Sequence, residues 1–315
     1  MTCESGSVPS RRPSRRHDFL ARAVPRLRKS RELDDPALER ARVERWHTTL
    51  PSALHRPLPT ALVPLFGRRF SVVNEDLDGH AVHTITPRHT AVTGTLLFVH
   101  GGGFMAPIDP FHLRFACRLA NRLGVRVVMP DYPLAPEHTW RDSFDSMLSL
   151  ATRLAGDEGQ LLIAGDSAGG GYALALTLAM RDAGGPTADR VVLLSPWVDL
   201  SASTPETPEF AARDPWLFLG KINLYAEWWA GSADELTRPE VSPALGDLHG
   251  LPRTLMLCGT RDALVPGCRL LARRAEEAGW DLTYLEEPDL IHVYPLLPGI
   301  PEARRAWKQI TSFLD

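Results

Sequence analysis

The stretch Gly165-Asp166-Ser167-Ala168-Gly169 lies between two apolar segments of different pattern. The run before it, Leu161-Leu162-Ile163-Ala164, predicts a short buried strand, and the apolar run after Gly170 predicts a helix. A serine at a sharp turn from strand to helix is exposed at the top of a sheet, and its neighbours must be small because the turn crowds the backbone. The pattern therefore indicates a nucleophilic serine that carries out acyl transfer. A glycine-rich junction without chemistry, or a weak phosphate loop, is the alternative.

A second glycine-rich segment, His100-Gly101-Gly102-Gly103, directly follows the apolar run Leu96-Leu97-Phe98-Val99. Three glycines allow backbone N–H groups to approach a substrate without obstruction by side chains. Such groups, together with the N–H that follows the nucleophile, stabilise the oxyanion of an acyl-transfer intermediate. A tight turn after a core strand is the alternative for this segment. We expect His100 to be a structural residue of the turn rather than a proton carrier.

Two further residues complete a candidate triad. Asp262 follows an apolar run and a short loop, which places its carboxylate at the sheet edge where ligands of open α/β sheets bind. A helix N-cap or an ordinary loop aspartate is the alternative. His292 also follows a strand-like run and is the only histidine after Asp262. The order Ser167, Asp262, His292 is that of hydrolase triads built around such a turn. Three rival acids lie too near the histidine in sequence to come from a separate strand end: Glu286, Glu287 and Asp289.

Together these motifs resemble the hormone-sensitive-lipase-type carboxylesterases of the α/β-hydrolase superfamily. The resemblance covers roughly Thr95 to the C-terminus. It rests on His100-Gly101-Gly102-Gly103, Asp131-Tyr132-Pro133-Leu134-Ala135-Pro136-Glu137, Gly165-Asp166-Ser167-Ala168-Gly169-Gly170, Asp262 and His292. It implies that Gly102, Gly103 and Ala168 donate the N–H groups of an oxyanion hole. The chain departs from the family after His292, where Val293-Tyr294 stands in place of the frequent glycine and aromatic residue, and we expect this to alter the pocket wall.

We therefore expect a serine carboxylesterase that hydrolyses short- to medium-chain carboxylic esters through an acyl-enzyme intermediate. In this mechanism His292 removes the proton of Ser167 and Asp262 orients the imidazole, so no metal or organic cofactor is required. The same triad serves a lactone hydrolase, a deacetylase or an amidase, and these alternatives stay open. A non-catalytic ligand-binding protein is a less favoured alternative. Neither glycine cluster fits G-x-G-x-x-G, which disfavours a nucleotide-binding enzyme.

The segment from about residue 31 to 66 has a helical pattern, with Asp34-Asp35-Pro36 as a start signal. The resemblance implies that these N-terminal helices join a later insertion, about 201–244, to form a cap over the active site. The insertion is rich in aromatic residues, which either pack as ordinary helices or line an acyl or alcohol pocket. The candidate substrate-binding residues are Phe104, Trp197, Trp216 and Leu217.

The alternation of apolar runs and helix-like segments predicts an α/β protein with a mostly parallel eight-stranded sheet and helices on both faces. The expected strands are Phe70–Val73 and Ala81–Thr86, paired as an antiparallel hairpin, and runs near 95–99, 125–129, 161–164, 191–195, 254–258 and 281–285. They belong to one catalytic domain, 67–315, with the cap as its insertion. We expect the last strand to lie at a sheet edge, where it is available for pairing in a homodimer.

Composition limits the remaining classes. A chain of 315 residues with a net charge of −3 indicates a globular protein that binds a small-molecule ester rather than nucleic acid. No apolar run approaches the roughly 20 residues that span a bilayer, so we expect no stable membrane insertion. The four cysteines show no metal-ligand spacing, which suits a reducing, cytoplasmic location. Residues 1–30 hold seven arginines and one lysine without a following apolar segment, which predicts a basic flexible tail rather than an export signal.

Overall fold

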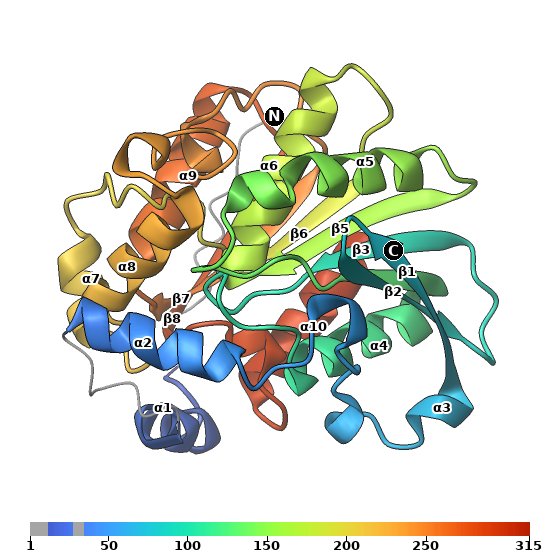
Figure 1. The fold of residues 1–315 in the computed structure, drawn as a ribbon, viewed down its shortest axis with the longest axis horizontal. Helices are drawn as coiled ribbons and strands as arrows, with labels where there is room; N and C mark the ends of the chain where they lie inside the picture. Colours follow the sequence, from blue (N-terminus) through green and yellow to red (C-terminus); the bar gives the residue numbers. More distant parts are fainter. Residues whose placement is uncertain (1–11, 28–34) are drawn as a thin grey trace.

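The computed structural model describes residues 12–27 and 35–315, and its strands form one sheet in the order β1-β2-β4-β3-β5-β6-β7-β8 (Figure 1). The strands are β1 Phe70–Leu77, β2 His80–Pro87, β3 Gly94–Val99, β4 Val125–Pro130, β5 Gln160–Asp166, β6 Arg190–Leu194, β7 Thr254–Arg261 and β8 Leu282–Ile291. Strand β2 is antiparallel to β1 and to β4, and all other neighbouring strands are parallel. The expected mostly parallel eight-stranded sheet, with its hairpin at the start, is confirmed.

The central strands are buried on both faces, which explains why they are continuous apolar runs rather than alternating ones. Successive side chains of β3 enter two different cores. Leu97 and Val99 belong to the core under α5, α6 and α9, whereas Leu96 and Phe98 belong to the core under α4 and α10. Strand β8 lies at the edge of the sheet, as expected, and pairing of two copies through it stays a prediction.

Helices cover both faces of the sheet, as expected (Figure 1). The longer helices are α1 Arg15–Leu27, α2 Pro36–His47, α4 Pro110–Leu123, α5 Phe144–Ala155, α6 Ser167–Asp182, α8 Leu219–Ala230, α9 Val265–Glu277 and α10 Pro301–Leu314. The shorter ones are α3 Phe66–Arg69, α7 Thr207–Arg213 and the 3₁₀ turns η1 Ala53–His55, η2 Thr60–Leu62, η3 Trp140–Asp142, η4 Ala233–Glu235, η5 Pro243–Leu245 and η6 Tyr294–Leu296.

The connection between β6 and β7 contains α7 and α8, and α8 packs against the N-terminal helix α2. Asp35 is the N-cap of α2, and its carboxylate accepts a hydrogen bond from the Ala37 N–H at 2.8 Å. Two segments that are far apart in sequence, residues 36–47 and the predicted insertion 201–244, therefore meet.

A buried carboxylate joins α2 to α8. Glu39 on α2 is 1% exposed and accepts two hydrogen bonds from the Arg42 guanidinium, at 2.8 and 2.7 Å. The Tyr225 hydroxyl of α8 donates to the same carboxylate, and the Lys221 ammonium lies 3.7 Å from it. Burial opposes ionisation of Glu39, but the hydrogen bonds from Arg42 and Tyr225 and the charge of Lys221 outweigh it and lower the pKa of this carboxyl.

The expectation of a flexible N-terminal tail is wrong for residues 15–27, which form helix α1. His17, Ala21 and Val24 are buried and recur at helical spacing, so they form one apolar face against the C-terminal part of the chain. Just before the helix, the N–H and hydroxyl of Ser14 donate to the Glu302 carboxylate at 2.6 and 3.0 Å. The surrounding arginines conceal this narrow face in the sequence. Residues 1–11 and 28–30 of the predicted tail lie outside the described residues.

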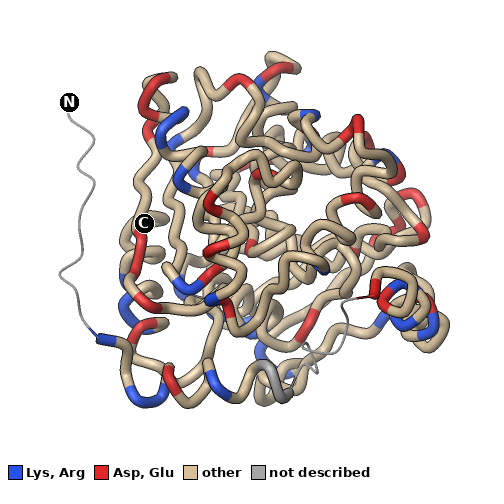
Figure 2. Tube along the Cα trace, turned by 90° about the vertical axis from the view of Figure 1, so that its left-hand side faces the viewer, with Lys and Arg blue, Asp and Glu red and all other residues tan. Residues whose placement is uncertain are grey.

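Basic and acidic residues are interspersed along the chain (Figure 2). In the two described ranges, no helix has both the length and the apolar character needed to cross a bilayer. Cys117, Cys258 and Cys268 are buried free thiols, and Cys3 lies outside the described residues.

Candidate active site

Ser167 lies at the junction that the sequence predicts, where β5 ends at Asp166 and α6 begins. Its φ of 52° is left-handed, which is the strained conformation expected for a serine at such a turn. A Cβ atom at Gly169 would lie 2.2 Å from the carbonyl oxygen of His100, and one at Gly171 would lie 1.9 Å from that of Trp197. The glycines are therefore required because the first turns of α6 pass directly against two other strand ends.

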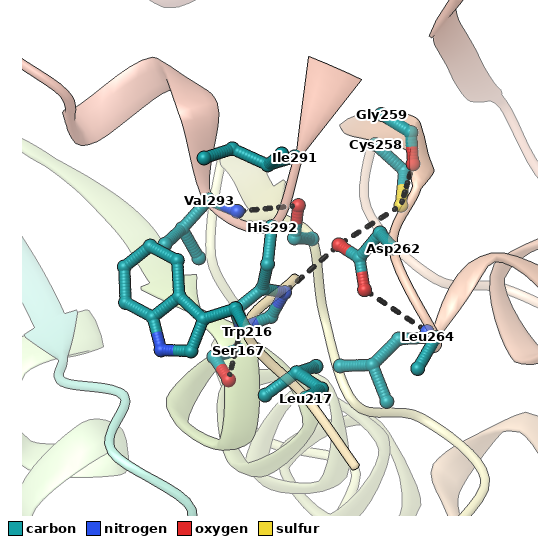
Figure 3. Close-up of polar contacts among 12 residues, drawn as sticks. Ser167, Trp216, Leu217, Cys258, Gly259, Asp262, Leu264, Ile291, His292 and Val293 are labelled. Carbon is teal, nitrogen blue, oxygen red and sulfur yellow. Dashed lines mark hydrogen bonds and ion pairs between the residues drawn. The ribbon is translucent and has the colours of Figure 1, made fainter. Parts of the chain in front are cut away.

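The three predicted triad residues meet at the carboxyl end of the sheet (Figure 3). The Ser167 hydroxyl lies 2.9 Å from His292 Nε2, and His292 Nδ1 lies 2.8 Å from the Asp262 carboxylate. They follow β5, β8 and β7, which are parallel to their neighbours and so end at the same edge. All three side chains are buried, at 8%, 3% and 0% exposure for the serine, histidine and aspartate.

The surroundings of Asp262 favour one arrangement of protons on His292. The Asp262 carboxylate accepts hydrogen bonds from the Leu264 N–H at 2.9 Å and from the Cys258 thiol at 3.5 Å, so it is held as an acceptor. Nδ1 of the imidazole then donates to it, and Nε2 faces Ser167 as an acceptor. Burial lowers the pKa of His292, but the negative charges of Asp262, Asp214 and Asp166 outweigh burial and raise it above its ordinary value.

The departure from the family after His292 falls at a residue with an unusual backbone conformation. Val293 has a φ of 46°, in the left-handed region that favours glycine and that a β-branched residue rarely adopts. Its N–H donates to the Ser195 hydroxyl at 3.0 Å. The turn that presents His292 is therefore kept although valine replaces the frequent glycine.

The second glycine segment reaches the same place from β3. Gly102 and Gly103 have φ values of 114° and 63°, and a Cβ atom at Gly103 would lie 3.0 Å from the Tyr225 ring. In the described part of the chain, the N–H groups of Gly102, Gly103 and Ala168 donate to no protein acceptor. These donors are therefore available to a bound oxygen atom.

Asp166 and Tyr132 form hydrogen bonds with the backbone of the glycine loop. Asp166 accepts the Gly101 N–H at 3.2 Å, and its other oxygen lies 3.2 Å from Nε2 of His112 on α4. The Tyr132 hydroxyl donates to the carbonyl of His100 at 2.8 Å, and the two rings stack with centroids 4.3 Å apart. Burial lowers the pKa of His100 to about 3, so its ring is neutral, which fits the structural role expected from the sequence.

Helix α2 contacts this loop through a residue that sequence reasoning did not single out. His47 Nε2 lies 2.8 Å from the carbonyl oxygen of Met105, and Nδ1 lies 2.6 Å from the Glu137 carboxylate. Glu137, from the proline-rich motif, thus has a structural contact near the site. Nothing in the local sequence of α2 indicates this contact, because it depends on how the helix docks.

Two of the four candidate substrate-binding residues lie beside the triad. Figure 3 shows Trp216 and Leu217 on either side of Ser167, and the Trp216 ring is edge-on to His292 with centroids 5.7 Å apart. Phe104 and Trp197 are nearly fully buried, and Phe104 stacks on Trp229 at 4.2 Å between centroids. The Phe104 and Trp197 rings lie 5.7 Å apart between centroids, and the contact of both residues with substrate stays a prediction.

The rival acids do not reach the triad. Glu286 pairs with Arg269 at 2.6 Å, and Glu287 pairs with Arg305 at 3.2 Å. Asp289 is exposed. The acid that sequence reasoning missed is Asp214, which is buried and interacts electrostatically with both Asp262 and His292. The only sequence signal for it is Asp214-Pro215, which reads as an ordinary turn.

Comparisons with known proteins agree with this geometry. The profile of the family described as alpha/beta hydrolase fold matches residues 96–296. An acetyl-hydrolase of Streptomyces hygroscopicus is 33% identical over 70% of this chain and 75% of its own length. An esterase of Acinetobacter venetianus is 27% identical over 71% of this chain and 75% of its own. The crystal structure of an esterase from the bacterial hormone-sensitive lipase family superimposes with a TM-score of 0.73 at 25% identity, covering 96% of this chain and 98% of that one. Because the family profile spans well over half of the sequence and includes the strands that carry the site, this chain belongs to the alpha/beta hydrolase fold family.

Proposed function

We propose that the protein is a serine carboxylesterase in which Ser167 is the nucleophile, His292 the general base and Asp262 the residue that orients the imidazole. The observation that carries this proposal is the continuous hydrogen-bonded line from Asp262 through His292 to the Ser167 hydroxyl, with distances of 2.8 and 2.9 Å. These distances lie in the range in which a base takes a proton from a nucleophile.

The geometry supports a two-step reaction. His292 Nε2 takes the hydroxyl proton while Ser167 Oγ attacks the ester carbonyl, and the resulting imidazolium gives that proton to the departing alcohol. A water molecule then attacks the acyl-enzyme, again losing its proton to His292, and Ser167 regains a proton as the carboxylic acid leaves. Asp262 supports the transient imidazolium because its carboxylate is buried at 2.8 Å from Nδ1.

The oxyanion that forms in each step requires donors that are in place before the reaction. We assign this role to the N–H groups of Gly102, Gly103 and Ala168, which have no protein acceptor in the ranges that the structure describes. Loss of one such donor typically costs about 3 kcal/mol of transition-state stabilisation. Both glycines have positive φ values, which glycine adopts without strain, so the backbone can present these N–H groups.

We propose esters of short- to medium-chain acids as the substrate class. Trp216 and Leu217 flank Ser167, and Phe104, which follows the glycine loop, stacks on Trp229, so large apolar side chains adjoin both the nucleophile and the glycine loop. Helix α2 and the insertion that contains α8 meet on the outside, and we propose that they form the cap. The names of the related acetyl-hydrolase and esterase support the same class.

Hydrolysis of p-nitrophenyl esters with acyl chains of increasing length tests the proposal in the wild type and in Ser167→Ala. We expect the wild type to prefer short chains, and Ser167→Ala to lose turnover while it keeps the wild-type circular dichroism spectrum. A lactone and an anilide in the same series separate ester hydrolysis from the alternatives that share the triad. Full esterase activity in Ser167→Ala would disprove the assignment of the nucleophile.

A further inference from the structure

A second buried carboxylate lies beside the triad. Asp214 directly follows α7 in the insertion and is 5% exposed. Its Oδ1 accepts hydrogen bonds from the N–H groups of Trp216 and Leu217, at 2.7 and 3.1 Å, and its Oδ2 accepts one from the Ala263 N–H at 2.8 Å. The proposed mechanism above does not use this group.

The three residues that donate to Asp214 lie in three parts of the site. Trp216 is edge-on to His292, and Leu217 lies on the other side of Ser167 (Figure 3). Ala263 directly follows the triad acid Asp262. One carboxylate therefore connects the insertion, which supplies the wall of the site, with the loop that supplies the acid of the triad.

The charge of Asp214 also acts on the imidazole. Asp262 and His292 are the charged groups that act on it: burial and the charge of Asp262 raise the pKa of Asp214, while the charge of His292 and the backbone N–H groups of Trp216 and Ala263 oppose that rise. In return, the negative charge of Asp214 raises the pKa of His292, along with those of Asp262 and Asp166. An ionised Asp214 therefore favours the imidazolium form, the form that His292 takes in the transition state.

We propose that Asp214 is a positioning residue for ester hydrolysis: it holds the Trp216-Leu217 wall against Ser167, fixes the loop of the triad acid, and stabilises the imidazolium by its charge. The inference rests on the proposed function, because it assigns Asp214 a part in the reaction of that same triad. It predicts that a change of this carboxylate alters both the placement of Trp216 and Leu217 and the protonation of His292.

Asp214→Asn tests the proposal because it keeps the size of the side chain but removes its charge and one of its two acceptor atoms. The matched control is Asp199→Asn. Asp199 is also buried in a loop, at 7% exposure, and accepts hydrogen bonds from Ser201 and Ser203 rather than from residues beside the triad. Both variants lose a buried, hydrogen-bonded carboxylate. Of the two carboxylates, Asp214 is the one whose charge acts on His292.

We expect Asp214→Asn to lower kcat by roughly 10- to 100-fold on a p-nitrophenyl ester, since displacement of catalytic groups by about 1 Å costs up to 100-fold. We also expect the acidic limb of its pH–kcat/KM profile to move to lower pH. His292 must be neutral to act as a base, and removal of a neighbouring negative charge lowers the pH at which it becomes protonated. A residue with only a structural role would lower activity without moving that limb. Asp199→Asn should keep the wild-type limb.

Asp214→Ser provides a second variant, because a serine hydroxyl can accept the N–H groups ahead of it in the turn without carrying a charge. It should show the same shift of the acidic limb. An unshifted limb in a folded variant, whether or not kcat falls, would overturn the proposal, and so would failure of both variants to fold, which would assign Asp214 a structural role alone. An inactive wild type would contradict the proposed function instead, so the two failures are distinguishable.

Discussion

The Nε2 atom of His17 accepts a hydrogen bond from the Ile291 N–H at 3.1 Å, one residue before His292. His17 belongs to α1 and is completely buried, so the N-terminal helix is attached to the turn that presents the imidazole proposed as the general base. Burial lowers the pKa of His17, against the opposing effects of Asp18 and Glu302. The ring therefore stays neutral near pH 7, as an acceptor at Nε2 must be.

Replacement of His17 by phenylalanine should destabilise the protein and lower its activity. The ring volume is kept, but the Ile291 N–H loses its acceptor in a buried position, which costs about 1–3 kcal/mol. His17→Gln is the matched control, because the glutamine side chain supplies an acceptor. Urea unfolding measures the loss of stability, and kcat measures its effect on the His292 turn. Equal stability of the phenylalanine variant and the wild type would contradict a role for this hydrogen bond.

Gly169→Ala should prevent formation of an active site. The added methyl group would lie 2.2 Å from the carbonyl oxygen of His100, so α6 or the glycine loop has to move. Gly185→Ala is its control, because nothing lies within 4 Å of a Cβ atom there. Comparison of kcat/KM and melting temperature for the two variants checks this. An active Gly169→Ala variant would show that the close approach of α6 to the strand end is not required.

The stability of the protein should fall in acid partly because of His80. Both ring nitrogens of this buried histidine are without hydrogen-bond partners in the described structure, and burial lowers its pKa to about 4. The unfolded chain takes up a proton near pH 6.5, whereas the folded chain resists it. His80 therefore favours the folded state fully above about pH 6.5, and this stability is lost as the pH falls toward 4.

His80→Phe isolates this contribution. The size of the effect is roughly 3 kcal/mol for a pKa difference of this order. Urea unfolding at pH 7.5 and at pH 4.5 should show a smaller loss of stability in His80→Phe than in the wild type. Other buried histidines contribute in both proteins, so the quantity to compare is the change in unfolding free energy between the two pH values. An identical change in His80→Phe and in the wild type would contradict the prediction.

His47→Ala should lower kcat more than it changes KM. The variant loses the hydrogen bond to the Met105 carbonyl, and Met105 follows the glycine loop that is proposed to bind the oxyanion. Looser positioning of those N–H groups weakens binding of the transition state, for which we expect roughly a tenfold loss. His249→Ala, at an exposed histidine paired with Asp247 on the surface, serves as the control. A rise in KM with unchanged kcat would instead place His47 in substrate binding.

The sheet and the candidate triad could be predicted from the sequence because their signals are local. Each strand is a compact apolar run, and each site residue stands directly after one of these runs, as Ser167 and Asp262 illustrate. Parallel strands bring such positions to one edge, so their order along the chain is sufficient to group them.

The remaining features depend on how distant segments dock. Asp214 has three donors, and one of them, Ala263, is far from it in sequence, so no local pattern distinguishes it from a turn aspartate. His47 and His17 act through backbone atoms of residues 105 and 291, and backbone groups carry no sequence signal. Helix α1 could not be predicted for another reason: its buried face is narrow and surrounded by arginines.

The most direct test of the central claim is to identify the residue that an ester-like inhibitor modifies. Diethyl p-nitrophenyl phosphate transfers its diethylphosphoryl group to an activated serine and releases p-nitrophenol. Mass spectrometry of the treated protein and of its peptides should show one added group on Ser167 in the wild type and none in Ser167→Ala. Modification of another residue, or equal modification of both proteins, would contradict the proposal that Ser167 is the nucleophile.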